Sequence, residues 1–286
     1  MSDPSQNKSG PKRVRTIGPA SFAPRQVGNY LSRLFEYGDL LLTLTHHRIR
    51  VRYKQSALGL AWALLQPLSL MLIYTVIFSV VTRIPSDGTP YAVFVYAALL
   101  PWTLFSTGLT SAVGGLVSHT HLITKVYFPR EILPLSYVLA AIFDFLTASL
   151  VLAAMMAYYG IVPSVHIFWT IPILGLGVCV LTSLSLMLSA MQVWVRDIGI
   201  AMPLVLQLWM FATPVVYPLS AVPQWLRGYY ILNPMTGVIE NFRRVVLQNT
   251  APDMPSLLAS AVFSVLMLPV AYLYFKQREA TMADVI

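Results

Sequence analysis

Long apolar runs separated by short polar stretches dominate the chain. Six apolar segments stand out, at about 61–82, 91–115, 132–158, 169–193, 198–217 and 257–275. A helix needs about 20 apolar residues to cross the hydrocarbon core of a bilayer, and each segment is close to that length. The fifth contains Pro203 and Pro214 and is the segment most expected to break or re-enter. The pattern predicts an all-α integral membrane protein with six transmembrane helices.

The regions outside residues 61–275 are more polar. Residues 1–29 are rich in Ser, Pro, Lys and Arg, which is typical of a disordered tail. In residues 30–60, an apolar stripe at helical spacing predicts an amphipathic helix in the membrane interface. A helix packed on a soluble partner is the alternative. The stripe consists of Leu31, Leu34, Phe35, Leu41 and Leu42. Residues 276–286 form a second polar end.

Composition supports the membrane assignment. Hydrophobic residues make up 57% of the 286 residues and charged residues 10%, and the mean hydropathy is +0.68. Soluble domains carry about 25% charged residues. The net charge of +8 is compatible with nucleic acid or anionic lipid, and the apolar excess favours membrane lipid and no nucleic acid. The single cysteine, Cys179, cannot form a disulfide within the chain.

The positive charges predict the orientation of the spans. Six crossings place both termini on one side of the membrane, and that side would hold fifteen Lys or Arg residues. The other side would hold Arg83, Arg227, Arg243 and Arg244. Cytoplasmic loops carry the Lys and Arg excess, so both termini are expected in the cytoplasm.

A basic strip of Arg48, Arg50, Arg52 and Lys54 precedes the first span. Anionic headgroups attract such cations by about 1 kcal/mol each, which is enough to hold the entrance of the span at the membrane surface. The same strip could also guide an anionic substrate, and both interpretations stay open.

Signatures of catalysis are missing from the sequence. It has no G-x-x-x-x-G-K-[ST] phosphate loop, no G-x-S-x-G and no H-E-x-x-H. The histidines His46, His47, His119 and His121 have no carboxylate cluster beside them, so no metal site is expected. The sequence therefore predicts neither an enzyme nor a cofactor site in this chain.

Asp144 is the one acid that lies well inside a predicted span. An ionisable group at that depth is a functional hypothesis, and we expect it to pair with a cation or polar backbone, or to be protonated. A proton-driven transporter that works alone is the rival interpretation that it supports.

The loop at residues 116–131 mixes aromatic and charged residues. The aromatic pair Tyr127 and Phe128 is expected to be exposed, with charges of both signs beside it on Lys125, Arg130 and Glu131. An exposed aromatic pair with flanking charges suits a docking surface, while anchoring in headgroups is the alternative.

The predicted external segment 218–250 is too apolar for a soluble loop. Asn233 as N-cap and Pro234 at the first helical position start a helix with one apolar stripe. Glu240, Arg243 and Arg244 lie off that stripe. We expect helices that dip into the outer leaflet, either to cap a pore exit or only to pack there.

Aromatic residues are abundant in and beside spans 1, 2 and 5. Most membrane aromatics pack or form interfacial belts, but a channel lined with rings would suit sugars. The candidates are Trp62, Tyr74, Phe78, Tyr91, Phe94, Trp102, Phe105, Trp209, Phe211 and Tyr217.

Several stretches together resemble the membrane subunit of ABC-2 type polysaccharide exporters, the group that exports O-antigen, capsule and teichoic acid. They are "RYKQSALGLAWALLQPLSLMLIYTVIF", "KVYFPREILPLS", "VWVRDIG", "QLWMFATPVVYPLS" and "LNPMTGVIENFRRVVL". The resemblance is collinear from about residue 30 to 275.

The resemblance implies an ABC-2 (type V exporter) fold, with six transmembrane helices, an N-terminal amphipathic interface helix and external re-entrant gate helices. It implies a homodimer in the bacterial inner membrane, bound to two separate ATPase subunits that carry ATP and Mg. The coupling element would comprise His121, Lys125, Tyr127, Phe128, Pro129, Arg130 and Glu131. The gate would include Trp225, Arg227, Glu240, Arg243 and Arg244.

The expected substrate is an O-antigen-like glycan on undecaprenyl-pyrophosphate, whose pyrophosphate would arrive near Arg48, Arg50, Arg52 and Lys54. Teichoic acid, capsule and a small lipid or drug are the alternative substrates of such an exporter.

Overall fold

The fold is entirely helical in the part of the chain that the structure describes. The computed structural model covers residues 36–54, 56–82, 85–126 and 128–285. Its α-helices are α2 (Gly38–Lys54), α3 (Ala61–Tyr74), α4 (Tyr91–Val113), α5 (Thr120–Lys125), α6 (Ile132–Tyr158), α7 (Thr170–Trp194), α8 (Asp197–Phe211), α9 (Gln224–Leu232), α10 (Pro234–Val246), α11 (Met254–Glu279) and α12 (Met282–Val285). A π-helix (Thr75–Val81) continues α3, and short 3-10 turns occupy Val117–His119, Val165–Trp169 and Leu219–Ala221.

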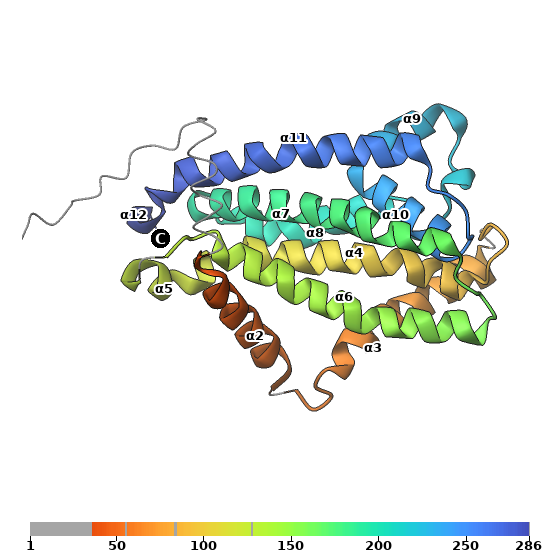
Figure 1. Ribbon diagram of the computed structural model, residues 1–286, viewed down its shortest axis with the longest axis horizontal. Helices are drawn as coiled ribbons and strands as arrows, with labels where there is room; N and C mark the ends of the chain where they lie inside the picture. The colour runs from red at the N-terminus through yellow and green to blue at the C-terminus, as the bar shows by residue number, and fades with distance from the viewer. Residues whose placement is uncertain (1–35, 55, 83–84, 127, 286) are drawn as a thin grey trace, which may run out of the picture.

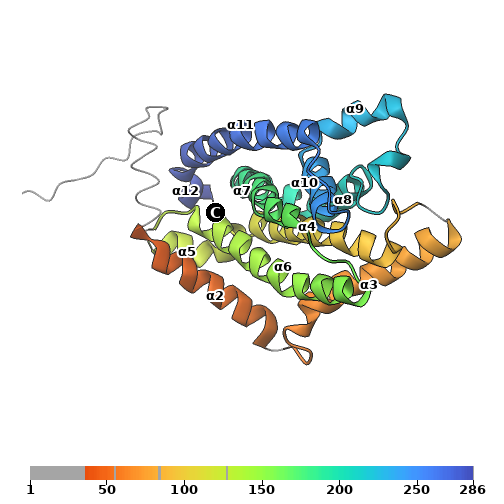
Figure 2. The ribbon, with the colours of Figure 1, turned by 45° about the vertical axis from the view of Figure 1, so that its right-hand side comes forward.

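Helix α4 lies at the centre of the bundle, in contact with α3, α6, α7, α8 and α10 (Figures 1 and 2). In its most apolar stretch 78% of the residues are buried, against 11% for the segment Ala61–Ser79. Helix α3 therefore lies at the periphery, where its apolar side chains face outward as lipid-facing residues do.

The predicted spans are confirmed as long helices in five cases. Ala61–Ser79, Tyr91–Val113, Ile132–Tyr158, Val165–Trp194 and Met254–Glu279 are each long and apolar enough to cross a membrane. The predicted boundaries agree with them to within a few residues.

The fifth predicted span is shorter than expected. Helix α8 has 15 residues and ends at Phe211, and residues 212–217 are turns and bends. The prediction of a helix over residues 198–217 is therefore wrong in its last part. Pro214 lacks an amide N–H and disfavours helix at the residue before it. The helix therefore ends before Pro214, although the apolar run continues to residue 217.

The bundle has two distinct ends (Figure 1). The start of α2, helix α5 and helix α12 gather at one end, which we call the loop end. Helices α9 and α10 lie at the other end, which we call the gate end. Helix α11 runs from the gate end to the loop end, so the described termini lie at the same end of the bundle.

The disordered tail predicted for residues 1–29 lies outside the described residues, as do Leu31, Leu34, Phe35 and Tyr127. Within the predicted interface region 30–60, helix α2 packs along α6. Leu41 and Leu44 contact the core at the loop end, whereas Leu42 is exposed.

Candidate translocation groove

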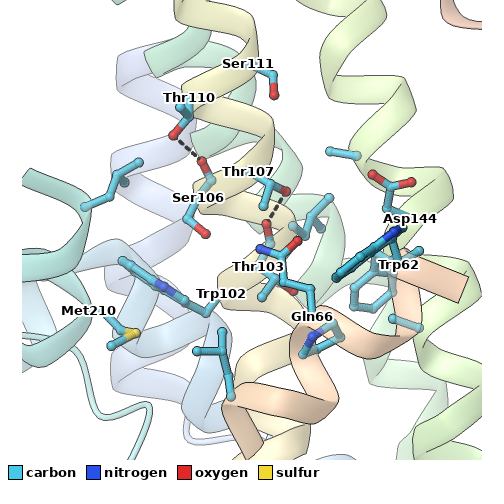
Figure 3. Close-up of a pocket in the computed structure, with 18 of the residues that line it drawn as sticks. Trp62, Gln66, Trp102, Thr103, Ser106, Thr107, Thr110, Ser111, Asp144 and Met210 are labelled. Carbon is cyan, nitrogen blue, oxygen red and sulfur yellow. Dashed lines mark hydrogen bonds between the residues drawn. The ribbon is translucent and has the colours of Figure 1, made fainter. Parts of the chain in front are cut away.

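A groove with a volume of about 820 Å³ opens on one side of α4 (Figure 3). Its walls come from α3, α4, α6 and α8, with the end of α2 at its rim. From Trp102 to Ser111 it follows α4 for about 14 Å at 1.5 Å per residue, roughly half the thickness of the hydrocarbon core.

One face of α4 supplies a ladder of hydroxyl groups to the groove. Its members are Thr103, Ser106, Thr107, Thr110 and Ser111. They recur at helical spacing, so they share a face. Thr107 Oγ1 donates to the Thr103 carbonyl at 2.6 Å and Thr110 Oγ1 donates to the Ser106 carbonyl at 2.8 Å (Figure 3). Because these protons are used within the helix, the hydroxyls present acceptor lone pairs to the groove.

Two glutamines add amide groups to the walls. Gln66 on α3 and Gln207 on α8 line the groove and are exposed, and neither forms a hydrogen bond with the described residues. A side-chain amide without hydrogen-bond partners is costly in hydrocarbon. The backbone of a helix cannot supply those partners, because its N–H and C=O groups already bond one another. The groove is therefore built to hold water or a polar ligand at bilayer depth.

Three of the ten predicted channel aromatics line the groove. Trp62 and Tyr74 come from α3, and Trp102 comes from α4. Tyr74 also donates from its hydroxyl to Met210 Sδ at 3.7 Å, which links α3 to α8. Apolar ring faces beside a hydroxyl ladder suit a ligand with both C–H and O–H surfaces.

The other predicted aromatics lie elsewhere. Phe94 and Phe105 are each 1% exposed and pack in the core. Trp209 contacts Phe105 edge to face at a centroid distance of 5.1 Å and donates from Nε1 to Asn233 Oδ1 at 3.1 Å. Phe211 is exposed on α8.

Three further aromatics of that set support the packing of neighbouring segments. Tyr91 is buried and donates to the Val216 carbonyl at 2.6 Å. The Tyr217 hydroxyl is 2.9 Å from that of Tyr230. Phe78 is half-buried against the core.

An ion pair lies at the rim of the groove. Arg52 of α2 is paired with Asp144 of α6, and the Tyr53 hydroxyl donates to Asp144 Oδ1 at 2.7 Å. The expectation that Asp144 pairs with a cation is confirmed. Burial and the bond to Asp144 raise the pKa of Tyr53 to about 12, so its hydroxyl remains a donor at neutral pH.

The basic strip is helical, and its members divide between two faces of α2. Arg48 Nε donates to Ser136 Oγ at 2.6 Å, and its guanidinium carbon is 3.5 Å from the centre of the Tyr137 ring. Burial lowers the pKa of Arg48. Arg50 and Lys54 are exposed.

The loop 116–131 is partly internal. Phe128 is 5% exposed and packs among apolar residues at the loop end, and Glu131 is 1% exposed. The expectation that Phe128 is exposed is wrong, because α6, α7 and α11 enclose this part of the loop. His121 and Lys125 are exposed, and Pro129 is half-buried.

Buried charges tie this loop to the end of α11. Lys276 Nζ is 2.6 Å from Glu131 Oε1 and 2.9 Å from Glu279 Oε2. The Arg130 backbone N–H donates to Glu279 Oε1 at 2.9 Å, and its side chain donates to the Glu279 carbonyl. Burial raises the pKa of Glu131, and the charge of Lys276 opposes that shift.

The predicted helix start at the gate end is confirmed. Asn233 caps α10 by accepting from the Met235 N–H at 3.1 Å, and Pro234 stands at its first turn. Glu240 and Arg243 lie off the apolar stripe of α10, as expected, but they are buried as well, because α4, α7 and α11 surround α10. Arg243 is 1% exposed, pairs with Glu240 and lies 4.0 Å above the Phe94 ring.

The remaining gate candidates lie nearer the surface. Trp225 is 74% exposed. Arg227 donates to the carbonyls of Val222 and Ser220 at 2.9 and 2.7 Å. Arg244 donates from Nε to the Ala251 carbonyl at 3.3 Å.

The model of ABC-2 type transporters matches residues 39–247, which is most of the chain. The chain belongs to the ABC-2 type transporter family. Permeases of this family are multi-pass membrane proteins without a catalytic domain, and ATP binds to a partner ATPase subunit. This agrees with the missing phosphate loop.

Curated relatives extend the match. The permease is 31% identical over 253 residues to the O-antigen export system permease protein RfbA of Myxococcus xanthus, covering 88% of this chain and 96% of that protein. It is 30% identical over 213 residues to a protein of the same name from Klebsiella pneumoniae, with coverages of 74% and 82%. The polysialic acid transport protein KpsM of Escherichia coli is 24% identical over 242 residues, with coverages of 82% and 91%.

Sequence reasoning missed the hydroxyl ladder and both glutamines of this ABC-2 permease. A signal for the ladder exists in "WTLFSTGLTSAVGG", where Thr and Ser recur at helical spacing within an apolar span. The cluster of Glu131, Lys276 and Glu279 has no comparable signal, because its members are distant in the chain.

Proposed function

We propose that this permease is the membrane-spanning half of an ATP-driven exporter that moves a lipid-linked polysaccharide across the bacterial inner membrane. The glycan is of the O-antigen type, carried on undecaprenyl-pyrophosphate. The relatives from Myxococcus xanthus and Klebsiella pneumoniae support this choice by their names. The groove beside α4 is the proposed path of the sugar chain.

The observation that carries the proposal is a groove of about 820 Å³, with a row of hydroxyl groups on one wall, along a central, otherwise buried spanning helix. Away from the Arg52–Asp144 pair, its lining is uncharged and mixes hydroxyls, amides and aromatic rings. Hydroxyl acceptors bond sugar hydroxyls, and rings pack on sugar C–H faces. Such contacts are weak and repeated, so a polymer binds without being held in one place.

We infer that the permease acts as a homodimer with two ATPase subunits. The groove is partly open to the outside, and a second copy facing it would complete an enclosed channel. In this arrangement the short helix α8 and the α9–α10 segment form one crossing with a cap at the gate end. The loop end, with His121 and Lys125 exposed, would contact the ATPase.

The proposed orientation places the loop end in the cytoplasm. The described termini lie together there (Figure 1), and Arg48, Arg50, Arg52 and Lys54 are in a helix that starts there. The Lys and Arg excess of cytoplasmic segments supports this choice.

A capsular polymer is the second candidate substrate. The relative named for polysialic acid transport supports it, at a lower identity of 24%. The paired state of Asp144 supports the exporter over a proton-driven transporter, because a carboxylate held by Arg52 and Tyr53 is not a free proton carrier.

The test is restoration of surface glycan. The chain and its ATPase are expressed in a strain that makes lipid-linked O-antigen but lacks its own permease, and intact cells are labelled with antibody to the glycan. A parallel strain that makes polysialic acid tests the second candidate. Labelling in neither strain, despite normal protein levels, contradicts a polysaccharide substrate.

The groove is tested by the triple variant Ser106→Ala/Thr107→Val/Thr110→Val. Each lost hydrogen bond is worth about 1 kcal/mol, so we expect surface labelling to fall about tenfold or more at normal protein level. The matched control is Thr147→Val on α6, whose hydroxyl also donates to its own helix, at 2.9 Å, but does not line the groove. Equal labelling in triple variant and control contradicts the proposed path.

A further inference from the structure

The cations of α2 have different surroundings although they recur at every second position. In a helix, residues four apart share a face. Arg48 and Arg52 therefore face α6, where they meet Ser136 and Asp144. Arg50 and Lys54 point away from this contact and are exposed.

Arg48 is occupied as an anchor. It donates to Ser136 and covers the ring of Tyr137, and its Nη2 is buried without a hydrogen-bond partner among the described residues. A ligand could reach it only by displacing this packing.

Arg52 is different because it lines the groove. Its side chain is 39% exposed, whereas that of Asp144 is 19% exposed. Its second guanidinium nitrogen is 3.5 Å from Ser111 Oγ, at one end of the hydroxyl ladder. The cation thus lies where the polar path begins, with one carboxylate of its own chain in front of it.

We propose that Arg52 is the anion-binding residue of the groove and that the Asp144 carboxylate is a built-in competitor, displaced by the diphosphate of a polyprenyl carrier. The proposal rests on the proposed function. It adds the residue that receives the carrier, Arg52, and the contact that occupies this residue when no carrier is bound, the ion pair with Asp144. Displacement makes binding depend on the ligand's charge, so a neutral polyprenol does not open the pair.

A diphosphate has the chemistry to win this exchange. It carries more than one negative charge and offers several oxygens to the planar guanidinium fork, which Asp144 engages through one oxygen. Asp144 is not left bare when it is displaced, because Tyr53 still donates to its other oxygen at 2.7 Å. Arg50 and Lys54, exposed on the same helix, add positive potential near the rim.

The displacement also has a mechanical consequence. The ion pair and the Tyr53 bond fasten the last turn of α2 to α6, while Arg48 fastens the turn before it. Release of Arg52 from Asp144 would loosen the end of α2 that leads into α3, which forms one wall of the groove.

The experiment measures binding of farnesyl diphosphate to the full-length permease with its ATPase in nanodiscs of zwitterionic phosphatidylcholine. We expect Asp144→Asn to bind about tenfold more tightly than wild type and Arg52→Gln to bind at least tenfold more weakly. Arg196→Gln, at an exposed cation away from the groove, should leave binding unchanged.

Three outcomes would overturn the proposal. They are unchanged or weaker binding in Asp144→Asn, full binding in Arg52→Gln, and equal binding of farnesol. Inorganic pyrophosphate and phosphatidylglycerol are the comparison ligands. If either binds Arg52 as tightly as farnesyl diphosphate does, the carrier assignment fails.

This test is separable from the proposed function. If surface glycan is restored in cells but the Asp144 and Arg52 variants bind like wild type, the exporter stands and the displacement mechanism fails. If no glycan reaches the surface while the variants bind as expected, the anion site stands and the glycan substrate fails.

Discussion

The groove beside α4 and the contact between α10 and α11 use the same residue types for opposite purposes. Both place Ser, Thr and amide side chains in apolar helices. In the groove, the Thr107 and Thr110 hydroxyls bond their own helix, the Ser106 hydroxyl has no partner among the described residues, and the amides of Gln66 and Gln207 face open space. In the α10–α11 contact, polar atoms find partners across the two helices.

Hydrogen bonds made by side chains join α10 to α11. Ser260 Oγ donates to the Pro234 carbonyl at 2.8 Å, and Asn241 Nδ2 donates to Ser256 Oγ at 3.0 Å. Gly237 allows this approach, because small residues let helix backbones come close. A small polar residue therefore joins two helices where the facing helix offers a hydrogen-bond partner. Where no helix faces it, the same residue type lines an open groove.

Gly237→Ala should break the closed contact and have the largest effect. A Cβ there would lie 2.1 Å from Ser260 Oγ and 2.3 Å from the Ser256 carbonyl oxygen, which is backbone and cannot turn away. We expect a loss of more than about 3 kcal/mol of stability, beyond the usual range for overpacking. Thermal unfolding in detergent, followed by the monodisperse fraction, measures it.

The matched control is Gly175→Ala on α7, where nothing lies within 4 Å of the added Cβ. Replacing a helical glycine by alanine without a clash stabilises by about 0.5–1 kcal/mol. If both variants unfold at the same temperature, the α10–α11 contact is not close-packed in the way described.

Lys276→Met tests a charged version of the closed contact, at the loop end. The substitution leaves Glu131 buried among apolar residues, with the Tyr272 hydroxyl 3.4 Å from Glu131 Oε1. We expect a loss of about 2–3 kcal/mol at pH 8, less than the 3–5 kcal/mol typical of a broken buried pair, because Glu131 can take up a proton.

The pH dependence has a definite sign. The pKa of Glu131 is already raised by burial, and removal of the Lys276 charge raises it further. The folded state of the variant then binds a proton that the unfolded state releases, so stability falls as the pH rises through that window. Unfolding temperatures of wild type and variant should converge from pH 8 towards pH 5, and a constant difference contradicts the assignment.

The sequence predicted the spans well because the bilayer sets their length. Five apolar runs became helices of the expected extent. The caps of α10 were also predictable, since Asn-Pro is a local signal. Periodicity identifies an apolar face but not what covers it. Phe128 was therefore expected to be exposed, although neighbouring helices bury it, and the burial of the charged Arg243 was not predicted.

The candidate site was only partly predictable for the same reason. Trp62, Tyr74 and Trp102 could be singled out as aromatics, but which rings face a groove depends on how α3 and α8 sit beside α4. Asp144 was identifiable as a buried acid, whereas its partners Arg52 and Tyr53 come from a helix about 90 residues away. Contacts between distant segments leave no local pattern in a single sequence.

Ser260→Ala and Ser106→Ala form the smallest and sharpest pair of tests, because they remove the same hydroxyl from the two regions. Ser260 bonds across helices, so its loss should cost about 1 kcal/mol. Ser106 lines the groove and its hydroxyl forms no bond with the described residues, so its loss should leave the unfolding temperature unchanged. Equal destabilisation by the two variants would mean that the groove hydroxyls also hold helices together. An unchanged stability in Ser106→Ala together with reduced export would assign this hydroxyl to the passing substrate, which a structural role cannot explain.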